Sequence, residues 1–263
     1  MKVLGVGDNC IDDYAELGKK YPGGNALNIA IYASRYPGVE ADYLGVVGTD
    51  ENGEYLLDEI KKQGLATDKI IVKEGENAVT RILIRDGDRV FDDYSEGVQK
   101  NAVLLLETIP QEFDLVHFVV WGFGREHVPS IKGSVLSCDF SSKLDDERTG
   151  IMRYLDYSFF SGGHLIREDA DPVEKVKELK NRTRGVVVMT LGEHGSIAYD
   201  GAQIFRGEAL PVDVVDTLGA GDAYIAAFLV SRLKGKTIQD SIATGHIAAR
   251  DICKRLGAWG GPD

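Results

Sequence analysis

The stretch that decides the fold is DTLGAGD at residues 216–222, followed directly by the apolar segment AYIAAFLV at 223–230. Gly219 and Gly221 leave backbone amides unshielded, and the apolar segment predicts a buried helix over 220–233. Helix-start amides and the positive end of the helix dipole attract anions such as phosphate. Asp222 lies where a carboxylate could take a proton from an attacking hydroxyl. The pattern therefore indicates phosphoryl transfer, although a plain helix cap would use the same residue types.

Composition and charge restrict the kinds of protein that this chain can be. It has 263 residues, 43% of them hydrophobic, and a formal net charge of -12. That length suits one large α/β domain, and the negative charge disfavours nucleic acids and anionic membranes as partners. A membrane-spanning helix needs about 18 consecutive apolar residues, and no segment of the sequence approaches that length. The first residues form a strand pattern and not a signal peptide, so we expect a cytoplasmic protein.

Short apolar runs alternate with helix-like segments, which predicts an α/β fold with a mostly parallel central sheet. The predicted strands of that sheet cover 3–7, 43–48, 115–120, 135–139, 157–160 and 186–191, with a late hairpin at 196–199 and 203–205. The predicted helices cover 27–36, 54–63, 173–180, 220–233 and 238–256. A β-rich interruption at 70–97 predicts a small hairpin. We expect a single domain, 1–263, with ligands at the carboxyl ends of the strands.

Two further segments contain glycine at places where a ligand could approach the backbone. GGNALN at 23–28 precedes the first long helix, and the amide of Asn28 can both donate to and accept from a sugar hydroxyl. TLGEHG at 190–195 follows an apolar strand and suits a nucleotide. Each segment by itself also fits an ordinary turn.

Together and in this order, the three segments resemble the signatures of the ribokinase-like carbohydrate kinases, also called the pfkB family. The amino-terminal signature is matched by Gly23, Gly24, Asn28, Gly45, Gly48, Asp50 and Gly53. The carboxyl-terminal signature is matched by 216–222. The resemblance covers nearly the whole chain, and it implies a three-layer α/β/α domain with a small β hairpin lid. It also implies a sugar substrate, ATP with Mg²⁺, and a region for K⁺ at Asp216 and Thr217, although K⁺ activation is not universal in the family.

The resemblance implies specific roles for residues of the catalytic and nucleotide sites. Asp222 matches the catalytic base, and the amides of Gly219, Ala220 and Gly221 match an anion hole. The positions that match nucleotide-phosphate contacts are Thr190 and Gly192, and Gly195 lies in the same turn.

The substrate candidates come from two parts of the chain. Asp12 matches the sugar-binding aspartate of the family, and Asp8 and Asn9 are the other candidates in that loop. Gly23, Gly24 and Asn28 complete the amino-terminal group. From the β-rich interruption we add Arg81, Tyr94 and Glu96.

Two features depart from the family pattern. The stretch 161–164 reads SGGH where many members carry Asn-x-x-Glu, so the metal ligands cannot be named. Glu168, Asp169 and Glu193 are candidates acting through water. The interval between Asp12 and Gly23 is short, which predicts a lid reduced to the hairpin at 80–94 and an open pocket for a substrate larger than a monosaccharide.

Within the family, the chain is most similar to members that phosphorylate the 6-hydroxyl of a fructosamine. The segments that carry this similarity are 7–12, 23–26, 89–98 and 257–259. Acidic side chains such as Glu96 could favour the cationic nitrogen of a fructosamine, with a solvated strand end as the alternative, and Arg81 could instead meet a carboxylate. The alternatives are a kinase of a plain ketohexose, a nucleoside or another small sugar, and a catalytically silent sugar-binding regulator.

Three smaller questions concern single residues and assembly. Trp121, at the end of a predicted strand, is interpreted as a packing residue in preference to a sugar contact. His117 lies inside the same strand and is interpreted as a core histidine. A homodimer formed through the small hairpin sheet is one alternative, because an unpaired edge can also be protected by charges.

Overall fold

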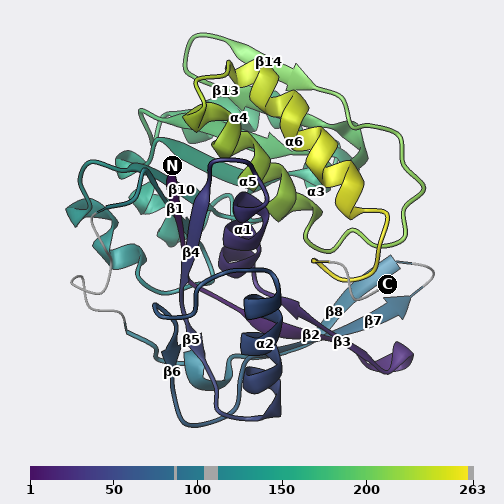
Figure 1. Ribbon diagram of the computed structural model, residues 1–263. Helices are drawn as coiled ribbons and strands as arrows, with labels where there is room; N and C mark the ends of the chain where they lie inside the picture. The colour runs from purple at the N-terminus through teal and green to yellow at the C-terminus, as the bar shows by residue number, and fades with distance from the viewer. Residues whose placement is uncertain (86–87, 104–111, 260–263) are drawn as a thin grey trace.

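A computed structural model describes residues 1–85, 88–103 and 112–259, with the side chains of 84–89 left out. Its centre is an eight-stranded sheet in the order β14-β13-β12-β11-β10-β9-β1-β4 (Figure 1). The strands are β1 Lys2–Val6, β4 Glu40–Leu44, β9 Leu115–Val119, β10 Val135–Asp139, β11 Tyr157–Ser161, β12 Val186–Thr190, β13 Ser196–Tyr199 and β14 Ile204–Gly207. The strands from β4 to β12 pair in parallel, and β13 and β14 are antiparallel. The predicted mostly parallel sheet is confirmed.

Helices cover both faces of this sheet, because the side chains of its strands alternate between two hydrophobic clusters. Val3 and Val188 belong to one cluster, and their neighbours Leu4 and Val187 belong to the other. The α-helices are α1 Asn25–Ser34, α2 Glu51–Lys62, α3 Gly163–Arg167, α4 Pro172–Lys180, α5 Ala220–Leu233 and α6 Ile238–Ile252. The short 3-10 helices are η1 Ala15–Leu17, η2 Gly97–Gln99, η4 Arg125–Ser130, η5 Glu147–Tyr154 and η6 Gly192–His194. In Figure 1, α1, α5 and α6 cross one face, and α4 packs in the other cluster. The fold has three layers.

A second sheet of four strands lies beside the main domain, in the order β3-β2-β7-β8 (Figure 1). Its strands are β2 Cys10–Tyr14, β3 Lys19–Gly23, β7 Val79–Arg85 and β8 Asp88–Ser95. The expectation of a lid reduced to the hairpin is therefore wrong, because β2 and β3 extend that hairpin. The sequences CIDDY and KKYPG did not predict strands, because they contain charged residues and a proline in place of alternating apolar residues.

The predicted strand at 43–48 is two strands in two different sheets. β4 ends at Leu44, and β5 Val46–Val47 pairs instead with β6 Ile71–Val72 in a two-stranded sheet near α2. After the break, the carbonyl of Val46 accepts a hydrogen bond of 2.8 Å from Nδ2 of Asn9, in the loop after β1. No helix of the described residues has the length and apolarity needed to cross a membrane.

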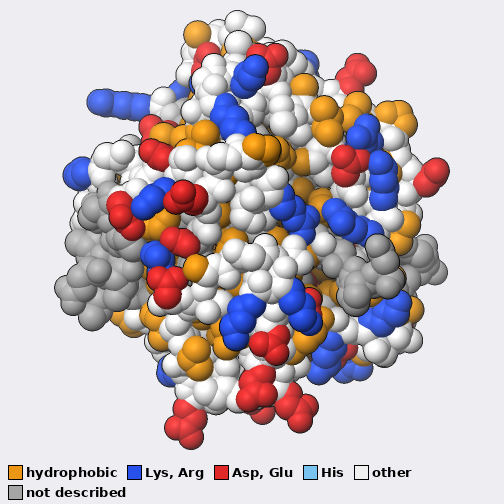
Figure 2. Space-filling model, viewed as in Figure 1, with side chains coloured by type: hydrophobic (Ala, Val, Ile, Leu, Met, Phe, Trp, Pro, Cys, Tyr) orange, Lys and Arg blue, Asp and Glu red, His pale blue; other side chains and the backbone are white. Residues whose placement is uncertain are grey.

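The net negative charge is spread unevenly over the surface. Figure 2 shows Lys and Arg side chains interspersed with Asp and Glu side chains over one face, with several Asp and Glu side chains at its lower edge. Figure 1 places α2 at that lower edge, and the first turn of α2 carries Glu51 and Glu54. A net charge of -12 thus leaves basic side chains on this face.

Candidate active site

The amino end of α5 holds two glycines that are needed for different reasons. Gly219 has φ +77°, and a side chain on it would collide with the Tyr32 hydroxyl and approach Ala258. Gly221 is exposed, and a Cβ there would have no atom within 4 Å. Packing therefore requires the first glycine, whereas the second leaves the backbone open where a ligand could approach it.

The backbone amides of this turn differ in how they are used. The amide of Ala220 donates to the carbonyl of Thr217 at 3.2 Å. Within the described part of the chain, the amides of Gly219, Gly221 and Asp222 donate no hydrogen bond. The turn bond occupies the amide of Ala220, and the amide of Asp222 is an open donor that the sequence pattern did not single out.

Asp222 is the buried carboxylate of the site, only 7% exposed. Its Oδ2 accepts a hydrogen bond of 2.7 Å from Nδ2 of Asn28. Burial raises the pKa of Asp222 well above its ordinary value, the Asn28 bond opposes that shift, and nearby Asp139 adds to it. A buried carboxylate with a raised pKa is suited to receive a proton.

The loop after β1 supports the start of α1. The carboxylate of Asp8 accepts from the amides of Ala26 at 2.9 Å and Asn25 at 3.2 Å, so it caps this helix. Asn9 is fully buried, and its Nδ2 donates to Tyr43 at 2.9 Å. Asn9 therefore supports the loop in this structure, and its role as a sugar contact stays a prediction.

Asp12 lies in β2 with its side chain 3% exposed. A Cβ on Gly23 would collide with its carboxylate, and a Cβ on Gly24 would collide with the backbone of Asn9. The two predicted glycines therefore allow β3 and the start of α1 to pack closely against the β1–β2 loop. Burial and the neighbouring charge of Asp12 raise the pKa of the Cys10 thiol, which indicates an unreactive cysteine.

The candidates from β7 and β8 lie on opposite faces of the small sheet. Tyr94 pairs with Thr80, and Thr80 pairs with Asp12 in the neighbouring strand, so these three side chains share a face. Arg81 follows Thr80 and lies on the other face, where it forms a 3.8 Å ion pair with Asp92. The structure therefore does not bring Arg81 to the face that carries Asp12, and its role as a substrate contact stays an untested prediction.

Tyr94 is close to the carboxylates of the site. Its pKa is raised first by burial and then by the charges of Asp8, Glu96 and Asp12. Glu96 itself is exposed. The substrate roles of Tyr94 and Glu96 stay predictions.

The predicted nucleotide residues lie in the turn between β12 and β13. Thr190 ends β12, with its hydroxyl 3.4 Å from the carbonyl of Phe160. Gly192 has φ +62° and no atom near its Cβ position, whereas Gly195 packs closely against the carbonyl of Gly207. The next residue, Ser196, is 2.8 Å from the Tyr224 hydroxyl, so this turn is joined to the beginning of α5. These assignments also stay predictions.

Asp139 is a site residue that the sequence analysis missed. It ends β10, is 8% exposed, and accepts hydrogen bonds from Asn25 at 3.2 Å and from the amide of Ser141 at 2.8 Å. Burial raises its pKa to about 6. A carboxylate at the carboxyl end of a strand predicted in a parallel sheet was the signal that could have found it.

The interpretations of His117 as a core histidine and of Trp121 as a packing residue have different outcomes. His117 is fully buried, contacts Ser137 at 2.9 Å, and has a pKa lowered to about 3 by burial, which confirms a core histidine. Trp121 is 48% exposed, with the cations of Lys143 and Arg148 4.9 and 5.2 Å from its ring centroid. The interpretation of Trp121 as a packing residue is wrong.

The described residues offer no protein cage for a metal ion. No three His, Cys, Asp or Glu side chains among them lie close enough together to hold one. The carboxylate of Glu193 is 90% exposed, and Asp169, with φ +56°, follows the end of α3. Since Mg²⁺ retains water and binds phosphate oxygens, any Mg²⁺ here would be held mainly by the nucleotide.

Asp216 joins the turn before α5 to two segments that are distant in sequence. Its carboxylate accepts from the amide of Leu218 at 2.9 Å, the amide of Gly257 at 3.1 Å and the hydroxyl of Tyr14. It therefore joins β2 and the carboxyl-terminal segment to the turn before α5.

We expect Asp216→Ala to destabilise the protein by about 2 to 5 kcal/mol, because it leaves several buried donors unpaired. Urea denaturation followed by circular dichroism would measure this loss. Asp213→Ala is the matched control: Asp213 is exposed, and its replacement should change the free energy of unfolding by less than about 0.5 kcal/mol. Equal losses in the two variants would contradict the role of Asp216.

The sheet order and the aspartate at the amino end of α5 define the class of this protein. Residues 8–122 and 158–261 match the pfkB family carbohydrate kinase, and the chain belongs to that family. It is therefore a sugar kinase, an enzyme that transfers a phosphoryl group to an alcohol.

Two relatives match the chain over nearly its whole length. It is 38% identical to fructoselysine 6-kinase of Escherichia coli (strain K12), with 98% of this chain and 100% of that protein covered. It is 34% identical to the fructosamine kinase FrlD of Bacillus subtilis (strain 168), with 99% of this chain and 93% of that protein covered.

Solved structures agree with the fold. The crystal structure of ribokinase from Thermotoga maritima has a TM-score of 0.81 at 19% identity, with 98% of this chain and 94% of that chain covered. Aminoimidazole riboside kinase from Salmonella enterica has a TM-score of 0.81 at 17% identity, covering 98% and 95%. The predicted ribokinase-like three-layer α/β/α fold is confirmed.

Proposed function

We propose that this protein is an ATP-dependent kinase that phosphorylates the 6-hydroxyl of a fructosamine such as fructoselysine. The observation that carries the proposal is the full-length similarity to two kinases named for these substrates. The cofactor in this proposal is ATP with Mg²⁺, and the protein acts in the cytoplasm. A plain sugar kinase is not favoured, because the relatives at 34 and 38% identity are named for fructosamine substrates. A silent regulator is not favoured, because Asp222 is retained in a buried site.

In the proposed reaction, Asp222 takes the proton of the 6-hydroxyl. The hydroxyl oxygen forms a bond to the γ-phosphorus of ATP, and the bond from that phosphorus to the β-γ bridging oxygen breaks to leave ADP. Charge on the transferred group is stabilised by the amides of Gly219 and Gly221, aided by the positive end of the α5 dipole. Oδ1 of Asp222 accepts no hydrogen bond from the described residues, so it is the oxygen that we assign to the hydroxyl.

The charge of the pocket supports a cationic substrate. Asp8, Asp12, Asp139 and Asp222 are all buried. After burial itself, the charge of Asp8 raises the pKa of Asp139, and the charges of Asp139, Asp8 and Asp12 raise the pKa of Asp222. The protonated nitrogen of a fructosamine would offset part of this repulsion. The face of the small sheet that carries Asp12 and Tyr94 is the surface that we assign as the sugar lid.

The proposal also includes activation by K⁺ and the formation of a homodimer. The carboxylate of Asp216 is committed to hydrogen bonds within the protein, so a K⁺ ion near Asp216 and Thr217 would bind backbone carbonyls. Activity in KCl against tetramethylammonium chloride tests this assignment. A homodimer would pair the small sheets of two chains, and light scattering tests it.

A panel of sugars tests the substrate. We expect ADP formation with fructoselysine to exceed that with fructose, ribose and adenosine by at least about 100-fold in kcat/KM, the scale expected when a buried charge loses its partner. The product should carry phosphate on O6 by phosphorus-coupled NMR, and chelation of Mg²⁺ should abolish turnover. A preference for a plain sugar would contradict the substrate, and sugar binding without any ADP formation would favour a regulator.

A further inference from the structure

The carboxyl-terminal segment reaches the catalytic aspartate through a single side-chain amide. The indole nitrogen of Trp259 donates to Oδ1 of Asn28 at 2.6 Å, and Nδ2 of Asn28 donates to Oδ2 of Asp222 at 2.7 Å. Trp259 and Asn28 are 4% and 3% exposed. The three side chains thus form a buried chain of hydrogen bonds that ends on the base.

The direction of this chain follows from the chemistry of its members. An asparagine amide has nearly the same shape when it is turned over, so shape alone does not decide which end faces Asp222. The indole N–H only donates, and it therefore requires the oxygen of Asn28 to face it. With that oxygen fixed, the NH₂ group must face the carboxylate. The opposite orientation would place the Asn28 oxygen against Asp222 and leave the indole N–H without an acceptor.

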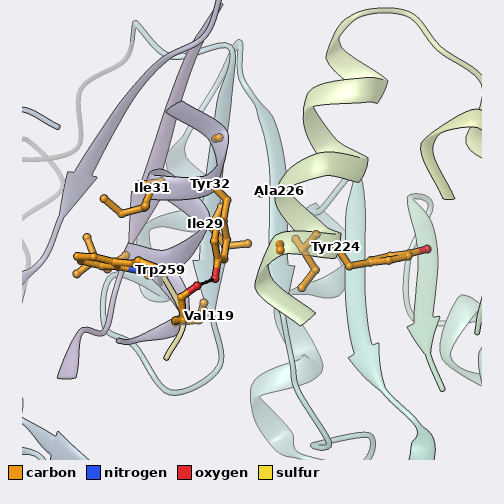
Figure 3. Packing of buried hydrophobic residues seen from close by; sticks show 14 of the residues in the cluster. Ile29, Ile31, Tyr32, Val119, Tyr224, Ala226 and Trp259 are labelled. Carbon is orange, nitrogen blue, oxygen red and sulfur yellow. Dashed lines mark hydrogen bonds between the residues drawn. The ribbon is translucent and has the colours of Figure 1, made fainter. Parts of the chain in front are cut away.

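The segment that carries Trp259 is attached to the catalytic turn at several points. The Gly257 amide donates to Asp216, the Tyr32 hydroxyl donates to the carbonyl of Ala258, and Ala258 packs where a side chain on Gly219 would lie. Figure 3 shows Tyr32 directed toward α5, with Trp259 on the other side of α1. Trp259 is thus held in place independently of the hydrogen bond that it makes.

We propose that Trp259 is a positioning residue for the catalytic base: its indole N–H fixes the Asn28 amide in the orientation that donates to Asp222. This inference rests on the proposed role of Asp222 as the base. It adds that a residue 37 positions after the base (259 − 222) controls the ionisation of the base without touching the substrate. The other charged and titratable groups near Asp222 are Asp139 of β10, Asp8 after β1, Asp12 of β2 and Tyr32 of α1.

The first test is Trp259→Phe, which keeps an aromatic ring but removes the N–H group. Asn28 is then free to turn its oxygen toward Asp222, which favours the protonated carboxylate and raises its pKa. Because the base must be ionised, the rising limb of kcat/KM against pH should move up by about one unit, and activity below that limb should fall about tenfold. The KM for ATP should stay within about twofold, since no nucleotide contact changes.

Two further variants separate positioning from a general loss of structure. Tyr32→Phe removes a different attachment of the segment, the hydrogen bond to the carbonyl of Ala258, and it should lower the denaturation midpoint without moving the pH limb. In an Asn28→Ala background, Trp259→Phe should cause no further shift, because the residue that transmits the effect is gone. A similar shift in Tyr32→Phe, or an additive shift in the double variant, would overturn the proposal.

A measurement without substrate distinguishes this inference from the proposed function. ¹³C NMR of aspartate-labelled protein, with the Asp222 signal assigned by its loss in Asp222→Asn, gives the pKa of Asp222 directly. We expect this pKa to rise in Trp259→Phe. An unchanged pKa would overturn the positioning role, whether or not Asp222→Asn is inactive. A raised pKa in a protein whose Asp222→Asn variant retains full turnover would instead overturn the catalytic role of Asp222.

Discussion

Replacing Asp222 by Asn should lower kcat by about 10² to 10⁴-fold, the usual contribution of a positioned general base. The two side chains have the same shape, and the new amide oxygen can accept the hydrogen bond from Asn28. The variant loses only the ability to take the proton from the sugar hydroxyl. The dissociation constants for sugar and ATP, measured by isothermal titration calorimetry, should therefore remain within a few fold of the wild-type values.

Asp222→Asn should lower activity but raise the stability of the folded protein at neutral pH. The pKa of Asp222 is raised in the folded protein from its ordinary value of 3.8, mainly by burial. Its contribution to stability is therefore full below pH 3.8 and declines as pH rises through the folded-state value. We expect Asp222→Asn to be more stable than the wild type at neutral pH and to lose this advantage toward pH 4. Urea denaturation across that range measures the difference.

Asp139→Asn is the matched control, because Asp139 is another buried carboxylate near Asp222 but is not assigned as the base. We expect it to lower kcat by less than about tenfold, the effect of a shift of about one unit in a neighbouring pKa. Turnover within a few fold of wild type in Asp222→Asn would remove Asp222 from the mechanism. Equal losses in both variants would indicate that charge in the pocket, and not proton transfer, limits the reaction.

The parts of the fold that could be predicted are those in which local sequence and tertiary packing agree. The helix predicted at 220–233 has the bounds of α5, because a glycine turn is followed by an uninterrupted apolar run that is buried throughout. The parallel strands were found for the same reason. β2 and β3 were missed because charged residues and a proline interrupt the apolar alternation of a strand. Asp12 of β2 is buried at the site, whereas Lys19 and Lys20 of β3 are exposed.

The site was less predictable, because its contacts join residues far apart in sequence. Asn28 and Trp259 are 231 positions apart, and nothing local to either residue indicates their hydrogen bond. Arg81 was a different case: the alternation of Thr80, Arg81 and Ile82 already placed its side chain on the other face from Thr80. Charge attracted attention to Arg81, but strand geometry decided its position.

Gly221→Ala should separate stability from catalysis more sharply than any other substitution in the turn. Gly221 lies in the first turn of α5, and an added Cβ has no atom within 4 Å. Alanine is a better helix former, so the free energy of unfolding should rise by about 0.5 to 1 kcal/mol. The methyl group projects into open space at the amides that we assign to the transferred phosphoryl group. Alanine keeps the backbone N–H, but its methyl group would keep a phosphoryl oxygen away from that donor, so we expect kcat to fall by about 10² to 10³-fold.

Gly219→Ala supplies the contrast, because its glycine is required by packing and by its φ of +77°. The new methyl group would strain the backbone and collide with Tyr32, so we expect a destabilisation of about 1 to 3 kcal/mol together with reduced turnover. Thermal denaturation and steady-state kinetics on both variants measure the two effects. A stable Gly221→Ala protein with normal kcat would show that the open space beside Gly221 is not where the phosphoryl group passes. If Gly221→Ala is instead less stable than the wild type, its loss of activity reflects misfolding. Binding of an ATP analogue to that variant then tests the anion site, and a phosphate site that is intact should bind the analogue with wild-type affinity.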